Sequence, residues 1–221
     1  MPEQAARPAP GAATGSGGTA APSGAASQAP PAPSERAARR PRRTDPDRRG
    51  RIVEACLDVI ADVGVAGTTH RRIAAAADIP LGSIHYHFEG MDELLREAFT
   101  RFAGTVGEVF ERRLAGAGDC EAAKAAVVAI ITEDVLGTQR ELVLTHELYT
   151  LAARSPGFRD ITNAWMARSR RALEARFDPV TARLLDALIE GLTIHRALDN
   201  VPHDPAAAAD AVERLTGSAR L

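Results

Sequence analysis

Residues 68–95 read TTHRRIAAAADIPLGSIHYHFEGMDELL and carry several helix-start and turn signals close together. Its two threonines are good helix caps, and the run HRRIAAAAD after them has the composition of a short helix. Residues 78–80, Asp-Ile-Pro, interrupt that run before LGSIHYHF, which predicts a second short helix over residues 81–88. The stretch therefore predicts two short helices joined by a tight turn.

Longer helices flank this pair. Before it, the Thr-Asp-Pro sequence at residues 44–46 predicts a helix start, and apolar residues then recur at three-to-four spacing until Gly64. After it, one apolar stripe runs over residues 92–115 and predicts a long helix. Gly104 and Gly107 should weaken the middle of that helix.

The rest of the chain also contains helix-start signals, namely Asp or Ser caps, two of them in Asp-Pro pairs. No segment of it has a convincing strand pattern. The sequence predicts an all-α fold of about nine helices. The five helices of the second half are expected over residues 119–136, 139–154, 156–177, 179–200 and 205–216.

The first 43 residues differ from this helical body. Thirty of them are Ala, Pro, Gly or Ser, and no Val, Ile, Leu, Phe, Trp or Tyr occurs before Ile52. Such a composition cannot bury a core, so we expect residues 1–43 to be a disordered tail. The tail carries six Arg and two Glu, whereas the whole chain of 221 residues has a formal charge of −2. A basic tail therefore precedes an acidic body.

Two short helices backed by a third are typical of a helix-turn-helix, in which the second short helix enters the major groove of DNA. An ordinary corner of a helical bundle has the same pattern, so the pattern alone leaves both interpretations open.

From about residue 45 to residue 102, the chain resembles the DNA-binding domain of TetR-family transcriptional regulators. The positions that match are Thr68, Thr69, Ile73, Ala74, Ala77, Gly82, Ser83, Ile84, Phe88, Leu94 and Leu95. The chain departs from the family at Asp78, His85 and Met91, where Gly, Tyr and Lys are common. The resemblance implies a helix-turn-helix domain over residues 44–103 and a helical domain for ligand binding and dimerisation over residues 104–221.

The same resemblance implies DNA contacts in the two short helices. The threonines would offer a helix N-terminus to a phosphate, Arg71 would reach the groove, and Gly82 would permit close approach. A solvated helix face is the alternative for the polar side chains. The residues assigned to DNA are Thr68, Thr69, Arg71, Gly82, Ser83, His85, Tyr86 and His87.

The run RAARRPRR at residues 36–43 lies directly before this domain. It is either a flexible arm that follows DNA phosphates or enters a minor groove, or a solvated linker.

A regulator that reads a palindromic operator needs two copies of the reading helix, and so we expect a homodimer. The helix predicted over residues 179–200 has a broad apolar face and a glycine that allows close helix approach. Packing inside one chain is the alternative for this face. The predicted dimer interface consists of Leu184, Leu188, Gly191, Leu192 and His195.

The family resemblance also implies a cavity for a small-molecule effector among the middle helices. These helices hold scarce aromatic and polar-aromatic residues, which are usual in small-molecule sites but are also common in a plain core. The predicted effector contacts are Phe110, His146, Tyr149 and Trp165.

Other classes of function find little support in the sequence. It contains no phosphate-binding loop, zinc-protease motif or nucleophile elbow, so we expect no enzyme, no cofactor and no metal site. Two distant cysteines and the lack of a long apolar run predict a cytoplasmic protein without membrane contact. The predicted function is a ligand-responsive repressor that a small molecule releases from double-stranded DNA. A helical adaptor that has lost DNA binding is the alternative, supported by His85, Met91 and the nearly neutral surface of residues 67–91.

Overall fold

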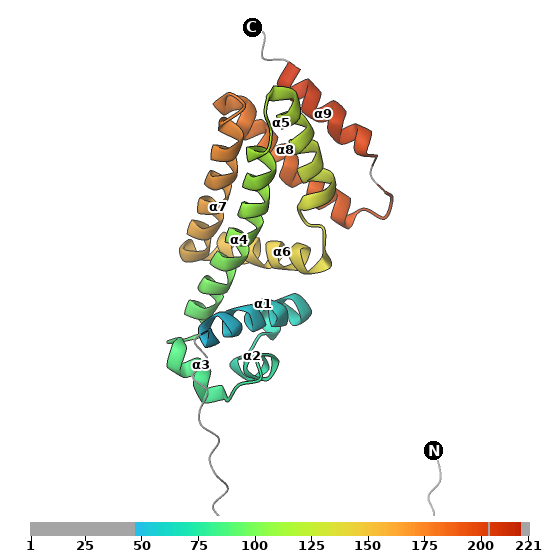
Figure 1. The fold of residues 1–221 in the computed structure, drawn as a ribbon. Coiled ribbons are helices and arrows are strands. Elements are labelled where there is room, and N and C mark those ends of the chain that lie inside the picture. Colours follow the sequence, from blue (N-terminus) through green and yellow to red (C-terminus); the bar gives the residue numbers. More distant parts are fainter. Residues whose placement is uncertain (1–46, 203, 218–221) are drawn as a thin grey trace, which may run out of the picture. The chain divides into compact units, whose positions relative to one another are not determined.

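A computed structural model describes residues 47–202 and 204–217, which belong to one compact unit. This part of the chain contains nine α-helices and no strand, so the predicted all-α class is confirmed (Figure 1). The predicted tail and the predicted helix start at residues 44–46 lie outside the described residues.

The helices follow the order that the sequence predicts. Their bounds are α1 Arg48–Gly67, α2 His70–Ala76, α3 Leu81–His87, α4 Met91–Ala115, α5 Cys120–Ala129, α6 Gln139–Arg154, α7 Pro156–Glu174, α8 Pro179–Leu198 and α9 Pro205–Gly217. Side chains of the residues before α2, α5, α6 and α8 accept N–H groups of the first turn, as expected for caps.

Two residues with positive φ shape the helix-turn-helix. Gly64, with φ of 70°, breaks α1 three residues before its end, where the sequence predicts the stop. Asp78, with φ of 51°, forms the turn between α2 and α3. A left-handed conformation is strained for most residues, and Asp is among the few that tolerate it. This explains how the chain keeps the turn without the Gly that is common there.

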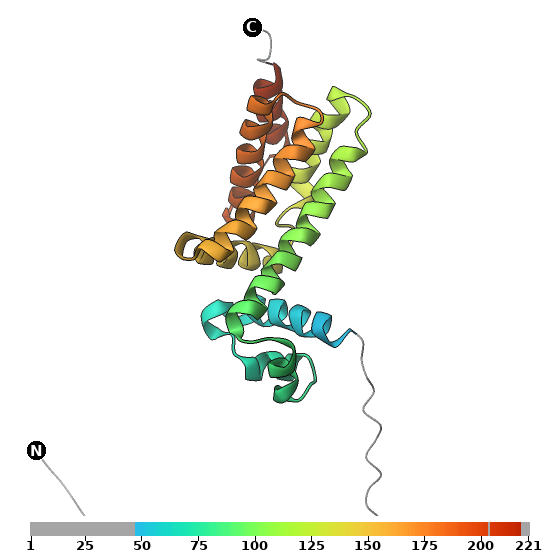
Figure 2. The ribbon, with the colours of Figure 1, turned by 90° about the vertical axis from the view of Figure 1, so that its left-hand side faces the viewer.

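Helix α4 joins the short helices to the rest of the unit (Figures 1 and 2). Helix α4 is continuous through Gly104 and Gly107, and the expectation that these glycines weaken its middle stays a prediction. A Cβ atom at Gly107 would lie 3.2 Å from the Cδ atom of Arg168 on α7. The guanidinium of Arg168 donates to the Gly104 carbonyl at 3.2 Å and to both carboxylate oxygens of Glu111. The missing side chain at Gly107 gives Arg168 room to tie α7 to α4.

The predicted helix over residues 119–136 ends early. Helix α5 stops at Ala129, a π-helical turn covers Ile130–Asp134, and Leu136 has a φ of 51°. The Arg196 guanidinium donates to the carbonyls of Thr132 and Val135, which satisfies backbone groups that the irregular turn leaves free. This partner lies more than 60 residues away, so no local pattern reveals it.

Two hydrophobic cores hold the helices. The first gathers buried residues of α1 to α4 with four residues of α6 and α7: Leu144, Leu148, Ala152 and Phe158. The second lies between α4, α5, the π-turn, α7, α8 and α9. Helices α4 and α7 thus contribute to both cores. Among the described residues, no helix is long and apolar enough to cross a membrane.

Candidate functional site

The outer faces of α2 and α3 form a polar surface around one prominent side chain. Tyr86 is 84% exposed, while Ile84 on the same helix is fully buried and fixes which face of α3 points outward. Arg71 is exposed on α2, and Thr69 caps that helix by accepting the Arg72 N–H. A Cβ atom at Gly82 would meet nothing within 4 Å, so this end of α3 is open to close approach. We call this surface the reading face.

Other predicted contact residues have partners inside the protein. Thr68 is buried, and its hydroxyl donates to the Gly64 carbonyl at 2.8 Å, so its side chain closes α1. The ring of His85 is exposed but stands edge-on to the ring of His70, with centroids 5.0 Å apart. Tyr86 and His87 form a second such pair, also at 5.0 Å. Ser83 is half-buried at the start of α3.

Arg49 on α1 holds the reading face in place. Its guanidinium donates to the His87 carbonyl at the end of α3 and bonds Glu93 at 3.1 Å and Glu97 on α4. It also lies 4.2 Å above the ring centre of Phe88. The hydrogen bond to Glu97 is the main cause that raises the pKa of Arg49. Its partners are 38 to 48 residues away, which explains why sequence reasoning missed it.

We expect Arg49→Ala to lower the free energy of unfolding by about 1–2 kcal/mol, through the lost carbonyl hydrogen bond and the lost contact with the Phe88 ring. The half-exposed ion pairs add little, because solvent screens them. Urea unfolding at one fixed protein concentration measures the loss. Arg96→Ala is the control, since Arg96 pairs with Asp92 one turn away on α4. Equal losses in both variants would contradict this role of Arg49.

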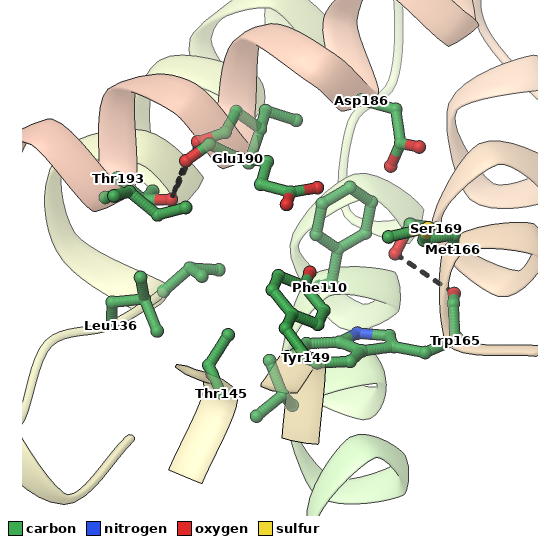
Figure 3. A pocket seen from close by; sticks show the side chains of 14 residues that line it. Phe110, Leu136, Thr145, Tyr149, Trp165, Met166, Ser169, Asp186, Glu190 and Thr193 are labelled. Carbon is green, nitrogen blue, oxygen red and sulfur yellow. Dashed lines mark hydrogen bonds between the residues drawn. The ribbon is translucent and has the colours of Figure 1, made fainter. Parts of the chain in front are cut away.

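A cavity lies between α4, α6, α7 and α8 (Figure 3). Phe110 of α4, Tyr149 of α6 and Trp165 of α7, three of the predicted effector contacts, line it. Its other walls include the strained Leu136 after the π-turn and one face of α8. The aromatic lining with a few polar groups is typical of small-molecule sites.

His146 lies outside this cavity, contrary to expectation. It lines a separate groove with Leu142 and Leu198, and its Nδ1 atom is 2.8 Å from the Leu142 carbonyl oxygen. His146 and Tyr149 are close in sequence on α6, but the helix turns them toward different neighbours.

Sequence reasoning missed the acidic side of the cavity. Asp186 and Glu190 of α8 both line it, one helical turn apart (Figure 3). Burial raises the pKa of Asp186, although Arg170, with Nη1 at 3.2 Å from the carboxylate, acts in the opposite direction. Burial and the neighbouring Glu190 hold the pKa of the Tyr149 phenol above its usual range. The spacing of Asp186 and Glu190, two acidic residues four apart in a mostly apolar helix, was the signal in the sequence that could have revealed this acidic side.

The outer face of α8 is apolar and exposed. Leu184 is 48% and Leu198 59% exposed, and a Cβ atom at Gly191 would meet nothing within 4 Å. His195 is exposed, whereas Leu188 and Leu192 are partly buried against the second core. The spacing of Leu184, Gly191, His195 and Leu198 places them on one stripe, the α8 stripe, which suits helix-to-helix packing.

Comparisons with known proteins agree with this geometry. The family model "Bacterial regulatory proteins, tetR family" matches residues 52–98, and "Tetracyclin repressor-like, C-terminal domain" matches residues 119–218. A solved member of the TetR family from Streptomyces coelicolor A3 is 35% identical, covers 77% of this chain and 99% of its own, and superposes with a TM-score of 0.66. The chain belongs to the TetR family of transcriptional regulators.

Two further relatives of this TetR-family regulator are informative. A transcriptional regulator from Streptomyces coelicolor A3(2) is 53% identical, with a TM-score of 0.74, and the match covers 78% of this chain and 100% of that one. The multidrug binding protein EbrR, solved in complex with ethidium, is 35% identical, with a TM-score of 0.65 and coverage of 76% and 98%. Because it belongs to a family of transcriptional regulators, this protein is a regulator and not an enzyme.

Proposed function

We propose that this TetR-family regulator binds a palindromic operator as a homodimer through its reading face and leaves the DNA when a small molecule fills the cavity. The observation that carries the DNA part is the outward Tyr86 on a helix whose other face, at Ile84, is fully buried. A short helix anchored in this way presents a fixed set of side chains to the major groove. Arg71 and the capped start of α2 supply phosphate contacts beside it.

The homodimer follows from the symmetry of such operators and from the α8 stripe. Two copies packed along this stripe place two reading faces on one side of the DNA, and each face then reads one half-site. The open surface at Gly191 lets two α8 helices approach closely. The residues proposed for the interface remain Leu184, Leu188, Gly191, Leu192 and His195.

The cavity is the proposed effector site. EbrR is solved with imidazole, ethidium, proflavin and malachite green, which supports a small-molecule site in this fold. Phe110, Tyr149 and Trp165 are proposed contacts, and His146 is proposed no longer because it faces another groove. By linkage, an effector that weakens DNA binding must itself bind more weakly when DNA is present.

Two helices connect the cavity to the reading face. Val106 and Phe110 of α4 line the cavity, and the first turns of α4 hold Arg49. Helix α6 places Tyr149 in the cavity, while its Arg140 bonds Glu54 and Asp58 of α1. A shift of either helix on effector binding therefore displaces α1, and with it the spacing of the two reading faces.

Gel-shift titration against the DNA that flanks the regulator's own coding region tests the DNA part, at two salt concentrations. We expect specific, salt-dependent binding and a footprint of two half-sites about 10 base pairs or a multiple of that apart, centre to centre. Equal weak binding to any DNA would instead favour the helical adaptor, and a single unrepeated half-site would contradict the homodimer.

A further inference from the structure

The walls of the cavity carry more negative than positive charge. Asp186 and Glu190 line it, and no Lys, Arg or His of the described residues does. Arg170 forms an ion pair with Asp186 at 3.2 Å. Within the described part of the chain, no ion pair of Glu190 with Lys, Arg or His is found. Arg170 and Arg183 both act on Asp186, so Glu190 is the acidic group of the cavity that a positively charged ligand can pair with.

The aromatic side chains of the cavity can contact a positively charged ligand. The rings of Tyr149 and Trp165 lie 6.3 Å apart, centre to centre, and are tilted by 37°. Both line the cavity beside Phe110, as Figure 3 shows. The negative faces of such rings attract a cation and also pack against a flat molecule.

Thr145 independently offers a polar group to a ligand in the cavity. Its side chain lines the cavity, it is 4% exposed, and its hydroxyl oxygen has no hydrogen-bond partner within the described residues. A buried hydroxyl without a partner is costly, and so it is rare in a folded protein. A polar group of a bound molecule would satisfy it.

We propose that the effector is a flat organic cation whose positive nitrogen lies beside Glu190 and Asp186, with its rings against Trp165 and Tyr149 and a polar group near Thr145. The claim that this cation acts as the effector rests on the proposed function. Its binding to the cavity does not, because binding is measured without DNA.

The experiment compares two probes that differ by one charge. N-methylphenanthridinium is cationic, and phenanthridine carries no charge at pH 7. Calorimetric titration of the full chain gives both affinities, and quenching of Trp165, the only Trp in the sequence, places each probe in the cavity. We expect the cation to bind about tenfold more tightly than the neutral probe, as one opposite charge in a partly buried site would produce.

Glu190→Gln and the double variant Asp186→Asn/Glu190→Gln identify the source of that preference. We expect the first to reduce the tenfold preference and the second to abolish it, with phenanthridine bound as before. Glu174→Gln is the matched control, because it removes one exposed carboxylate of α7 that does not line the cavity. Thermal unfolding of each variant verifies that it folds.

Three outcomes would overturn the inference: tighter binding of the neutral probe, no binding of either probe at millimolar concentration, or a cation preference that persists in the double variant. A gel shift with the cation then tests the regulatory step alone. Cation binding in the cavity without any change in operator affinity would contradict the effector part of the proposed function and leave the ligand class standing. If neutral molecules release the operator and the cation does not bind, the proposed ligand class is contradicted. The effector part of the proposed function then stands.

Discussion

Gly191→Gln is expected to convert the proposed homodimer into a monomer and to lower operator affinity at least about a hundredfold. The new side chain points from the α8 stripe into open space, since a Cβ atom at this position meets nothing within 4 Å of the same chain. The monomer therefore tolerates it, whereas a second copy packed on the stripe does not. Losing the link between two half-sites removes an avidity gain of roughly 10²–10⁴.

Sedimentation velocity gives the oligomeric state of this variant, and gel shift gives its operator affinity. Gly104→Gln is the matched control, because Gly104 is also inside a helix and a Cβ atom there also meets nothing within 4 Å. Both substitutions gain similar helix propensity. A Gly191→Gln protein that stays dimeric and keeps its operator affinity would show that the interface lies elsewhere.

Tyr86→Ala is expected to weaken operator binding about tenfold to a hundredfold while leaving stability almost unchanged. Its side chain is 84% exposed, so folding gains little from it, and a lost base or phosphate contact costs about 1–3 kcal/mol. Surface substitutions of this kind usually change the free energy of unfolding by less than about 0.5 kcal/mol.

Val201→Ala is the control for this second variant, because Val201 is 72% exposed but lies after α8, outside the reading face. Gel shifts at several salt concentrations separate two kinds of contact. A salt slope reduced by about 0.9 indicates a lost phosphate contact, whereas an unchanged slope indicates a lost base contact. Unaltered affinity in Tyr86→Ala, together with equal weak binding to any DNA, would support the adaptor interpretation.

The helix-turn-helix was predictable because its causes are local. Caps, turn residues and apolar spacing within about 30 residues set the starts of α2 and α3, and the structure confirms both. The position of Tyr86 on an exposed face follows from the buried Ile84 two residues before it. The wrong end of α5 shows the limit of such reasoning, since Arg196, far along the chain, supports the π-turn that replaces its last turns.

The all-α class and the order of the helices were predictable from the sequence, because capping and periodicity act between neighbours along one helix. Only the tertiary structure decided the rest. It placed Arg49 between α3 and α4, turned His146 away from the cavity and brought Glu190 and Thr145 into its walls. These arrangements depend on how helices distant in sequence pack, and the packing direction of each helix is fixed by two cores that no single segment contains.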